Sequence, residues 1–131
     1  SKESDYKDIS LKCFEMFSHL KYVAISNRTA LTASNNIWNG YLYVKNDPKF
    51  EYVGMKYNLI PICDRVGAGD SFVAGIIYGL LNQDKYSFQN IIDFASTLGA
   101  LNHSTSGDAS RFTPSEIWHT LEVSGTGRII R

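Results

Sequence analysis

The pattern of apolar and polar residues along the chain predicts four helices. The first predicted helix spans about residues 6–19, a second covers 70–81 and a third covers 87–103. The fourth opens at Thr113, where Thr-Pro-Ser-Glu gives a capping box with proline at the first helical position, and it ends near residue 122. The apolar side of the first helix is expected to carry Ile9, Cys13, Met16, Phe17 and Leu20. The second mixes small and large apolar residues, as a buried helix does, and the third is expected to bury Phe88, Ile91, Ile92, Ala95, Leu98 and Leu101.

Short β-branched and aromatic runs predict strands in the first half of the chain. One strand is predicted over 22–25, a hairpin over 37–57 that turns at Asn46-Asp47-Pro48, and a further strand over 59–63. The polar segment 26–36 is interpreted as a loop, and Trp38, Tyr41 and Tyr43 as strand packing residues. Strands alternating with helices predict an α/β layered domain with the hairpin at one edge of the sheet and helices over its faces.

Composition removes several classes of function. The 131 residues are enough for one domain with its own core. Lysine plus arginine equal aspartate plus glutamate at 13 each, so charge gives no reason to expect nucleic acid or an anionic membrane as partner. No apolar run approaches the roughly 20 residues of a membrane span, and no signal-peptide pattern opens the chain. Two cysteines, Cys13 and Cys63, match no zinc spacing, and free thiols in a cytoplasmic protein are expected.

The candidate chemistry lies in the turn Gly67-Ala68-Gly69-Asp70, between the last predicted strand and the second predicted helix. Small residues let a ligand approach the backbone closely. Amides at a helix start favour anions through their free donors and the helix dipole. A carboxylate at Asp70 is then placed to take a proton from a hydroxyl that attacks a phosphate.

Two better-known phosphate-binding loops do not match this turn, whereas an ordinary helix start does. A dinucleotide fingerprint would need glycine where Phe72 stands, and a Walker loop would need Lys-Ser/Thr where Asp70-Ser71 stands. A Gly-Ala-Gly-Asp turn taken alone is also explained as an ordinary helix start, with Asp70 stabilising the helix dipole.

The longer segment from Asp64 to Gly75 resembles the second signature of the ribokinase (PfkB) family of carbohydrate kinases. That signature is usually Asp-Thr-x-Gly-Ala-Gly-Asp-x-Phe before an alanine- and glycine-rich helix, and here Arg65 replaces the threonine. Residues 23–39, 102–112 and 125–131 resemble the family's 2-keto-3-deoxygluconate kinase subgroup. The resemblance implies a ribokinase-like layered α/β/α fold, of which residues 1–131 are the carboxy-terminal, nucleotide- and phosphate-binding part.

The resemblance also implies roles for individual residues, with ATP, magnesium and a potassium-type cation as cofactors and a sugar acid as substrate. Asp70 is the expected base and contacts the substrate. The other implied positions are Gly67, Ala68 and Gly69 as the anion hole, Ser26, Asn27 and Arg28 near the nucleotide, Asn102 and His103 on its adenine side, Asp108 at the keto-sugar acid, and Asp64 with the Val66 carbonyl at the cation.

The family's glycine-rich sugar-recognition segment, lid strands and Asn-x-x-Glu magnesium motif are expected upstream, and no Asn-x-x-Glu occurs in the chain. We therefore expect the chain alone to be inactive and to self-associate into a homo-oligomer through surfaces that the upstream part would cover. A truncated nucleotide-binding or interaction module without catalysis is the alternative. Asp108 follows a glycine in a polar segment and is equally explained by turn chemistry.

Overall fold

A computed structural model describes residues 2–32, 36–59 and 68–103. The helix predicted over 113–122 and most of the strand predicted over 59–63 lie outside these residues. The described elements are α1 (Lys2–Met16), β1 (Tyr22–Ala30), β2 (Asn36–Val44), β3 (Glu51–Val53), β4 (Tyr57–Leu59), α2 (Ala68–Leu81) and α3 (Phe88–His103).

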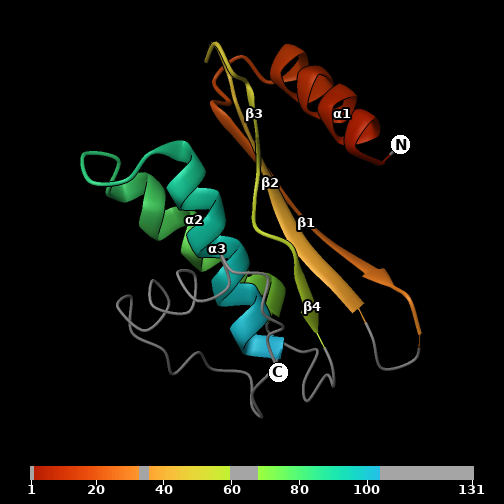
Figure 1. The fold of residues 1–131 in the computed structure, drawn as a ribbon. Coiled ribbons are helices and arrows are strands. Elements are labelled where there is room, and N and C mark those ends of the chain that lie inside the picture. The colour runs from red at the N-terminus through yellow and green to blue at the C-terminus, as the bar shows by residue number, and fades with distance from the viewer. Residues whose placement is uncertain (1, 33–35, 60–67, 104–131) are drawn as a thin grey trace.

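The described elements form three layers, with α1 on one face of the sheet and α2 and α3 on the other (Figure 1). The sheet runs in the order β1-β2-β3, and β4 also pairs with β2. All these pairings are antiparallel. β2 is therefore the central strand, while β3 lies at an edge, so the predicted hairpin reaches from the middle of the sheet to its rim.

The side chains of β2 contribute alternately to two hydrophobic clusters, one on each face of the sheet. Trp38, Leu42 and Val44 pack into the cluster under α2 and α3. Tyr41 and Tyr43 point the other way and pack with Phe14 of α1. Successive strand residues face opposite sides of a sheet, and here both sides are covered, which explains why β2 is buried at nearly every position. The packing role predicted for Trp38, Tyr41 and Tyr43 is confirmed.

The loop predicted from residue 26 is wrong in its first half, because β1 continues to Ala30. β1 pairs with β2 residue by residue as far as Ala30 opposite Asn36. The polar side chain of Asn27 is satisfied within the fold, since its Oδ1 accepts a hydrogen bond from Tyr6 Oη at 3.0 Å and its Nδ2 donates to Thr29 Oγ1 at 3.2 Å. Pairing with a long neighbour stabilises a strand that lacks an apolar pattern of its own.

The apolar side predicted for α1 is wrong for Ile9, Met16 and Phe17, which are exposed, whereas Cys13 and Leu20 are partly buried. The helix buries Ser10 and Phe14 against the sheet, whereas Ile9 and Met16 are 50% and 74% exposed. Phe14 meets the ring of Phe50 edge-on at 5.9 Å. Aromatic contacts thus decide which side of α1 faces the sheet, and the aliphatic stripe is left on the surface.

α2 and α3 pack closely because glycine faces the neighbouring helix. A Cβ at Gly75 would lie 2.8 Å from Ala95 Cα, and one at Gly79 would lie 2.6 Å from Ile91 Cγ2. The apolar side predicted for α3 is confirmed, with Phe88 partly buried at its start. α2 is buried on one side only, contrary to the prediction of a fully buried helix.

The hairpin turn is confirmed, and Asp47 organises it. Asn46 has a φ of 64°, a conformation that asparagine tolerates better than most residues. The Asp47 carboxylate accepts hydrogen bonds from the amides of Lys49 and Phe50 and, at 2.6 Å, from the hydroxyl of Tyr52. The bond to Asp47 raises the pKa of Tyr52 to about 12.

Candidate active site

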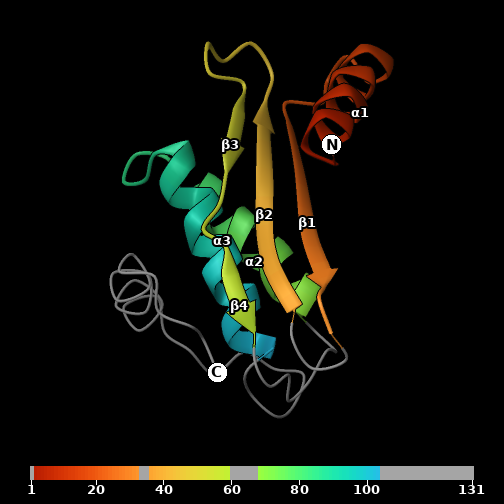
Figure 2. The same ribbon diagram turned by 45° about the vertical axis from the view of Figure 1, so that its right-hand side comes forward.

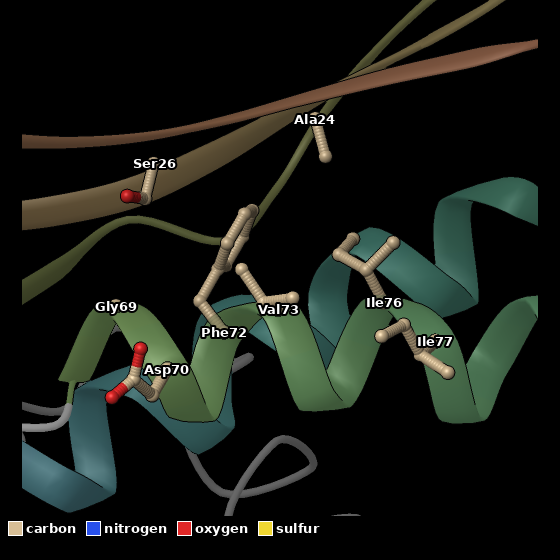
Figure 3. A pocket seen from close by; sticks show the side chains of 8 residues that line it. All are labelled: Ala24, Ser26, Gly69, Asp70, Phe72, Val73, Ile76 and Ile77. Atoms are coloured by element: carbon tan, nitrogen blue, oxygen red, sulfur yellow. The ribbon is translucent and has the colours of Figure 1, made fainter. Parts of the chain in front are cut away.

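The predicted helix start is present, and it places Gly69 and Asp70 in the first turn of α2. The first amides of an α-helix have no partner within the helix and carry the positive end of its dipole. The Asp70 side chain is exposed at this end of the helix (Figure 3). The sequence predicted a carboxylate at a helix start, and Asp70 lies there; its role and that of the amides stay predictions.

Gly69 differs from the other glycines of the described residues. A Cβ built at Gly69 meets nothing within 4 Å, whereas one built at Gly40, Gly54, Gly75, Gly79 or Gly99 comes within 3.0 Å of a neighbouring atom. Packing against the described residues therefore explains those five glycines and does not explain Gly69. An open backbone at a helix start is suited to close approach by a ligand.

A cavity of about 340 Å³ opens between this helix start and β1. Figure 3 shows Ser26 on the strand across from the turn that carries Gly69 and Asp70. Among the described residues that line it, Asp70 carries the only charge, and the floor is apolar. The full lining is Ala24, Ser26, Gly69, Asp70, Phe72, Val73, Ile76 and Ile77.

Phe72 anchors this turn to the sheet through contacts with β2. Its ring is 2% exposed and fills the space above Gly40, where an added Cβ would collide with it. The ring also meets Trp38 edge-on at 6.2 Å, and Trp38 Nε1 donates to the Ser96 carbonyl at 2.9 Å. Asp70 lies two residues before this anchor, so the contact between α2 and β2 positions the candidate base. The sequence analysis used Phe72 to exclude a dinucleotide loop and as the last residue of the family signature, and nothing in it indicated the partner Gly40.

The three β1 residues predicted near a nucleotide do not share one face. Ser26 lines the cavity, and Arg28 follows it on the same side of the strand. Asn27 lies on the opposite side and is hydrogen-bonded to Tyr6 of α1. The structure thus brings Ser26 together with Asp70 and directs Asn27 away from them.

The two residues predicted on the adenine side lie at the end of α3. Asn102 is buried, and His103 is the last residue of the helix. Asp64, Val66, Gly67 and Asp108 lie outside the described residues, and Ala68 is placed as the first residue of α2. Within the part of the chain that the structure describes, no group of three or more acidic, histidine or cysteine side chains is arranged to hold a metal ion. The same part contains no helix that is long and apolar enough to cross a membrane.

A glycine and a carboxylate thus lie at a helix start beside a cavity in a mixed α/β fold, and similarity to known proteins shows the family. Residues 40–115 match the pfkB family of carbohydrate kinases. The chain therefore belongs to that family.

Individual relatives agree with this assignment. An uncharacterized sugar kinase of Dictyostelium discoideum is 33% identical over 92 residues, a match that takes in 58% of this chain and 26% of the relative. The crystal structure of 2-dehydro-3-deoxygluconokinase from Thermotoga maritima is 29% identical, with a TM-score of 0.79 over 89% of this chain and 34% of that one. A structure from Enterococcus faecalis, named as a candidate 2-keto-3-deoxygluconate kinase, is 29% identical, with a TM-score of 0.77 over 92% and 33% of the two chains.

The chain spans about a third of the length of these solved structures and about a quarter of the curated relative. The mixed α/β fold of the described residues thus corresponds to one portion of a ribokinase-like kinase.

Proposed function

We propose that this chain is the phosphate-handling part of an ATP-dependent carbohydrate kinase that phosphorylates a hydroxyl group of a sugar or sugar acid. The observation that carries the proposal is the first turn of α2, where Gly69 and Asp70 adjoin a cavity that Ser26 also lines. Membership of the pfkB family supports the reaction class.

In the proposed reaction the acceptor hydroxyl attacks the terminal phosphorus of ATP. Asp70 takes the hydroxyl proton as the new oxygen–phosphorus bond forms, and the bond from phosphorus to the bridging oxygen breaks to release ADP. The amides of Gly67, Ala68 and Gly69 donate to the phosphoryl oxygens, where negative charge is concentrated. Among the described residues nothing packs against the position of a Cβ at Gly69, which supports this role.

The substrate that similarity favours is 2-keto-3-deoxygluconate, because two solved relatives are named for kinases of this sugar acid. Asp108 would then contact the sugar acid. Ser26 and Arg28 would approach the nucleotide from β1, and Asn102 and His103 would do so from the end of α3. Asn27 would support the strand from its other face, since it is bonded to Tyr6.

Metal ions enter this proposal in two ways. The described residues offer no acidic cluster, so magnesium would arrive on the ATP phosphates, as it does where a protein lacks a cage of its own. A potassium-type cation would be held by Asp64 and the Val66 carbonyl, outside the described residues.

A nucleotide-binding module without transfer is the second candidate. It is favoured by the helix start of α2 and the adjoining cavity, which would bind a phosphate group whether or not transfer follows. The chemistry requires both reactants to be held in line, since proximity supplies about 7–11 kcal/mol of a barrier only in that case.

Two measurements on the purified chain separate these functions. In an NMR titration, ATP with magnesium is expected to shift the amide signals of Ser26, Gly69 and Asp70, and unchanged signals would overturn the site. In a coupled ADP-release assay with 2-keto-3-deoxygluconate, magnesium and potassium, no turnover is expected. Turnover near the roughly 1 s⁻¹ of ordinary kinases would show that the chain works alone.

A further inference from the structure

Two buried hydrogen bonds join α3 to the middle of the sheet. Trp38 Nε1 of β2 donates to the Ser96 carbonyl at 2.9 Å. The Thr97 hydroxyl donates to the Asp93 carbonyl at 2.7 Å, so in its bond with the Tyr57 hydroxyl of β4 it is the acceptor. Trp38 and Tyr57 are opposite each other in the β2–β4 ladder, and in Figure 2 both helices lie behind these strands. Two paired strand residues thus hold two consecutive residues of α3.

The indole of Trp38 also contacts the start of α2. The Phe72 ring meets it edge-on at 6.2 Å, with an angle of 87° between the ring planes. The indole is 4% exposed and lies against Gly99 of α3, where an added Cβ would be 2.4 Å from Trp38 Cζ2. A closely packed interior transmits displacement, so a movement of this ring would be felt by both helices.

The space beside Phe72 is filled by the same residue of α3 that Trp38 binds. A Cβ at Gly40 would lie 2.3 Å from Phe72 Cε1 and 3.0 Å from Ser96 Oγ. A Cβ at Gly54 would also lie 2.3 Å from Ser96 Oγ, and Ser96 is completely buried. The Phe72 ring and Ser96 therefore meet over Gly40, and the bond from Trp38 to Ser96 fixes one side of the place that the ring occupies.

We propose that Trp38 is a positioning residue for Asp70, because it holds Ser96 of α3 and bounds the ring of Phe72. Asp70 lies two residues before Phe72 in the first turn of α2 (Figure 3). The inference rests on the proposed function, in which Asp70 is the base. Trp38 is not among the described residues that line the cavity, so its influence reaches the reaction through the placement of the carboxylate. A misplacement of about 1 Å at a reacting group can cost about 10²-fold in rate.

Residual dipolar couplings of the backbone amides test this placement on the chain without any ligand, since each coupling reports the orientation of one N–H bond. In Trp38→Phe, the couplings of α2 are expected to depart from the parent values relative to those of β2. Gly99→Ala keeps the indole but displaces it, and the same departure is expected. Tyr57→Phe is the matched control, because it removes the neighbouring bond to α3 and leaves the contact between Trp38 and Phe72 in place. Parent couplings in Trp38→Phe and Gly99→Ala, or an equal departure in Tyr57→Phe, would overturn the proposal.

A longer kinase polypeptide that contains this chain gives the kinetic test. Trp38→Phe is expected to lower the turnover number by about 10- to 10²-fold and to leave the KM for ATP unchanged. Added to Asp70→Asn, it should change turnover by no more than about twofold, because residues that act as a unit are not additive. A substitution that only destabilises the fold would lower turnover by the same factor in both backgrounds, and that outcome would contradict the positioning role.

The two proposals fail in different ways. Near-normal turnover of Asp70→Asn would refute the proposed base, whatever the couplings show. Normal turnover of Trp38→Phe beside an impaired Asp70→Asn would refute the positioning role of Trp38 alone.

Discussion

Comparing Gly69→Ala with Gly75→Ala tests whether Gly69 is needed for ligand binding, because Gly75 is needed for helix packing. A methyl group at Gly69 meets no described atom within 4 Å, whereas one at Gly75, in the same helix, lies 2.8 Å from Ala95 Cα. The two variants add the same atom to the same helix and differ only in what surrounds it.

The structure gives the two substitutions opposite signs in stability. Replacing glycine by alanine at a compatible helical position stabilises a protein by about 0.4–1 kcal/mol, because the unfolded chain loses conformational freedom. For a chain of this size, Gly69→Ala should raise the midpoint of thermal unfolding by about 1–5 °C. Gly75→Ala should lower stability by about 1–3 kcal/mol, since the α2–α3 contact would have to open.

The two substitutions should also differ in their effect on the Kd for ATP, which only Gly69→Ala is expected to raise. The added methyl at Gly69 stands where a phosphate would approach the amides, so we expect the Kd for ATP to rise at least about tenfold, or 1.4 kcal/mol. Gly75→Ala, wherever it remains folded, should keep the parent Kd. Thermal unfolding and an ATP titration followed by NMR measure the two quantities on the same samples. A Gly69→Ala variant that is as unstable as Gly75→Ala, or that binds ATP as the parent does, would refute the ligand role of Gly69.

In a longer kinase polypeptide that contains this chain, Asp70→Asn should lower the turnover number by about 10²-fold or more and leave the Kd for ATP close to the parent value; near-normal turnover would remove Asp70 from the mechanism. Ala24→Pro should cost less than about 1 kcal/mol, because it removes an outward amide at a sheet edge, whereas Ile25→Pro removes an amide directed at β2 and should cost about 2 kcal/mol or more; equal urea midpoints would contradict the assigned edge. The ring signals of Tyr52 should titrate near pH 12 and, after Asp47→Asn, near about 10. The folded chain holds this proton more tightly, so the stabilisation is complete below about pH 10 and is lost as the pH rises towards 12; a parent titration near 10 would exclude the bond.

The sequence predicted the fold best where periodicity and turn chemistry agree. α3 has apolar residues on every turn, and the hairpin has turn residues between two aromatic runs, so both were located to within a few residues. α1 shows where periodicity fails, because its aliphatic stripe is regular but aromatic partners on the sheet bury the other side. β1 beyond Ile25 has no apolar pattern, since the long neighbour β2 supplies the stabilisation.

For the site, the pattern Gly-Ala-Gly-Asp predicted the helix start, and alternation along a strand decided the rest. Neighbouring residues of β1 must face opposite sides, so Ser26 and Asn27 cannot both line one cavity. The contact between Phe72 and Gly40 joins residues far apart in the chain, and no local pattern indicates it.

The cavity has two walls of unequal stiffness, and the contact of Phe72 with Gly40 stiffens one of them. The wall that carries Asp70 is locked to the centre of the sheet by Phe72 and to α3 by Gly75 and Gly79. The wall that carries Ser26 is a rim strand, held among the described residues by one ladder and by the contacts of α1. A bulky ligand would therefore be accommodated by outward bending of β1, while Asp70 keeps its place, so variation in ligand size is absorbed on the side away from the carboxylate.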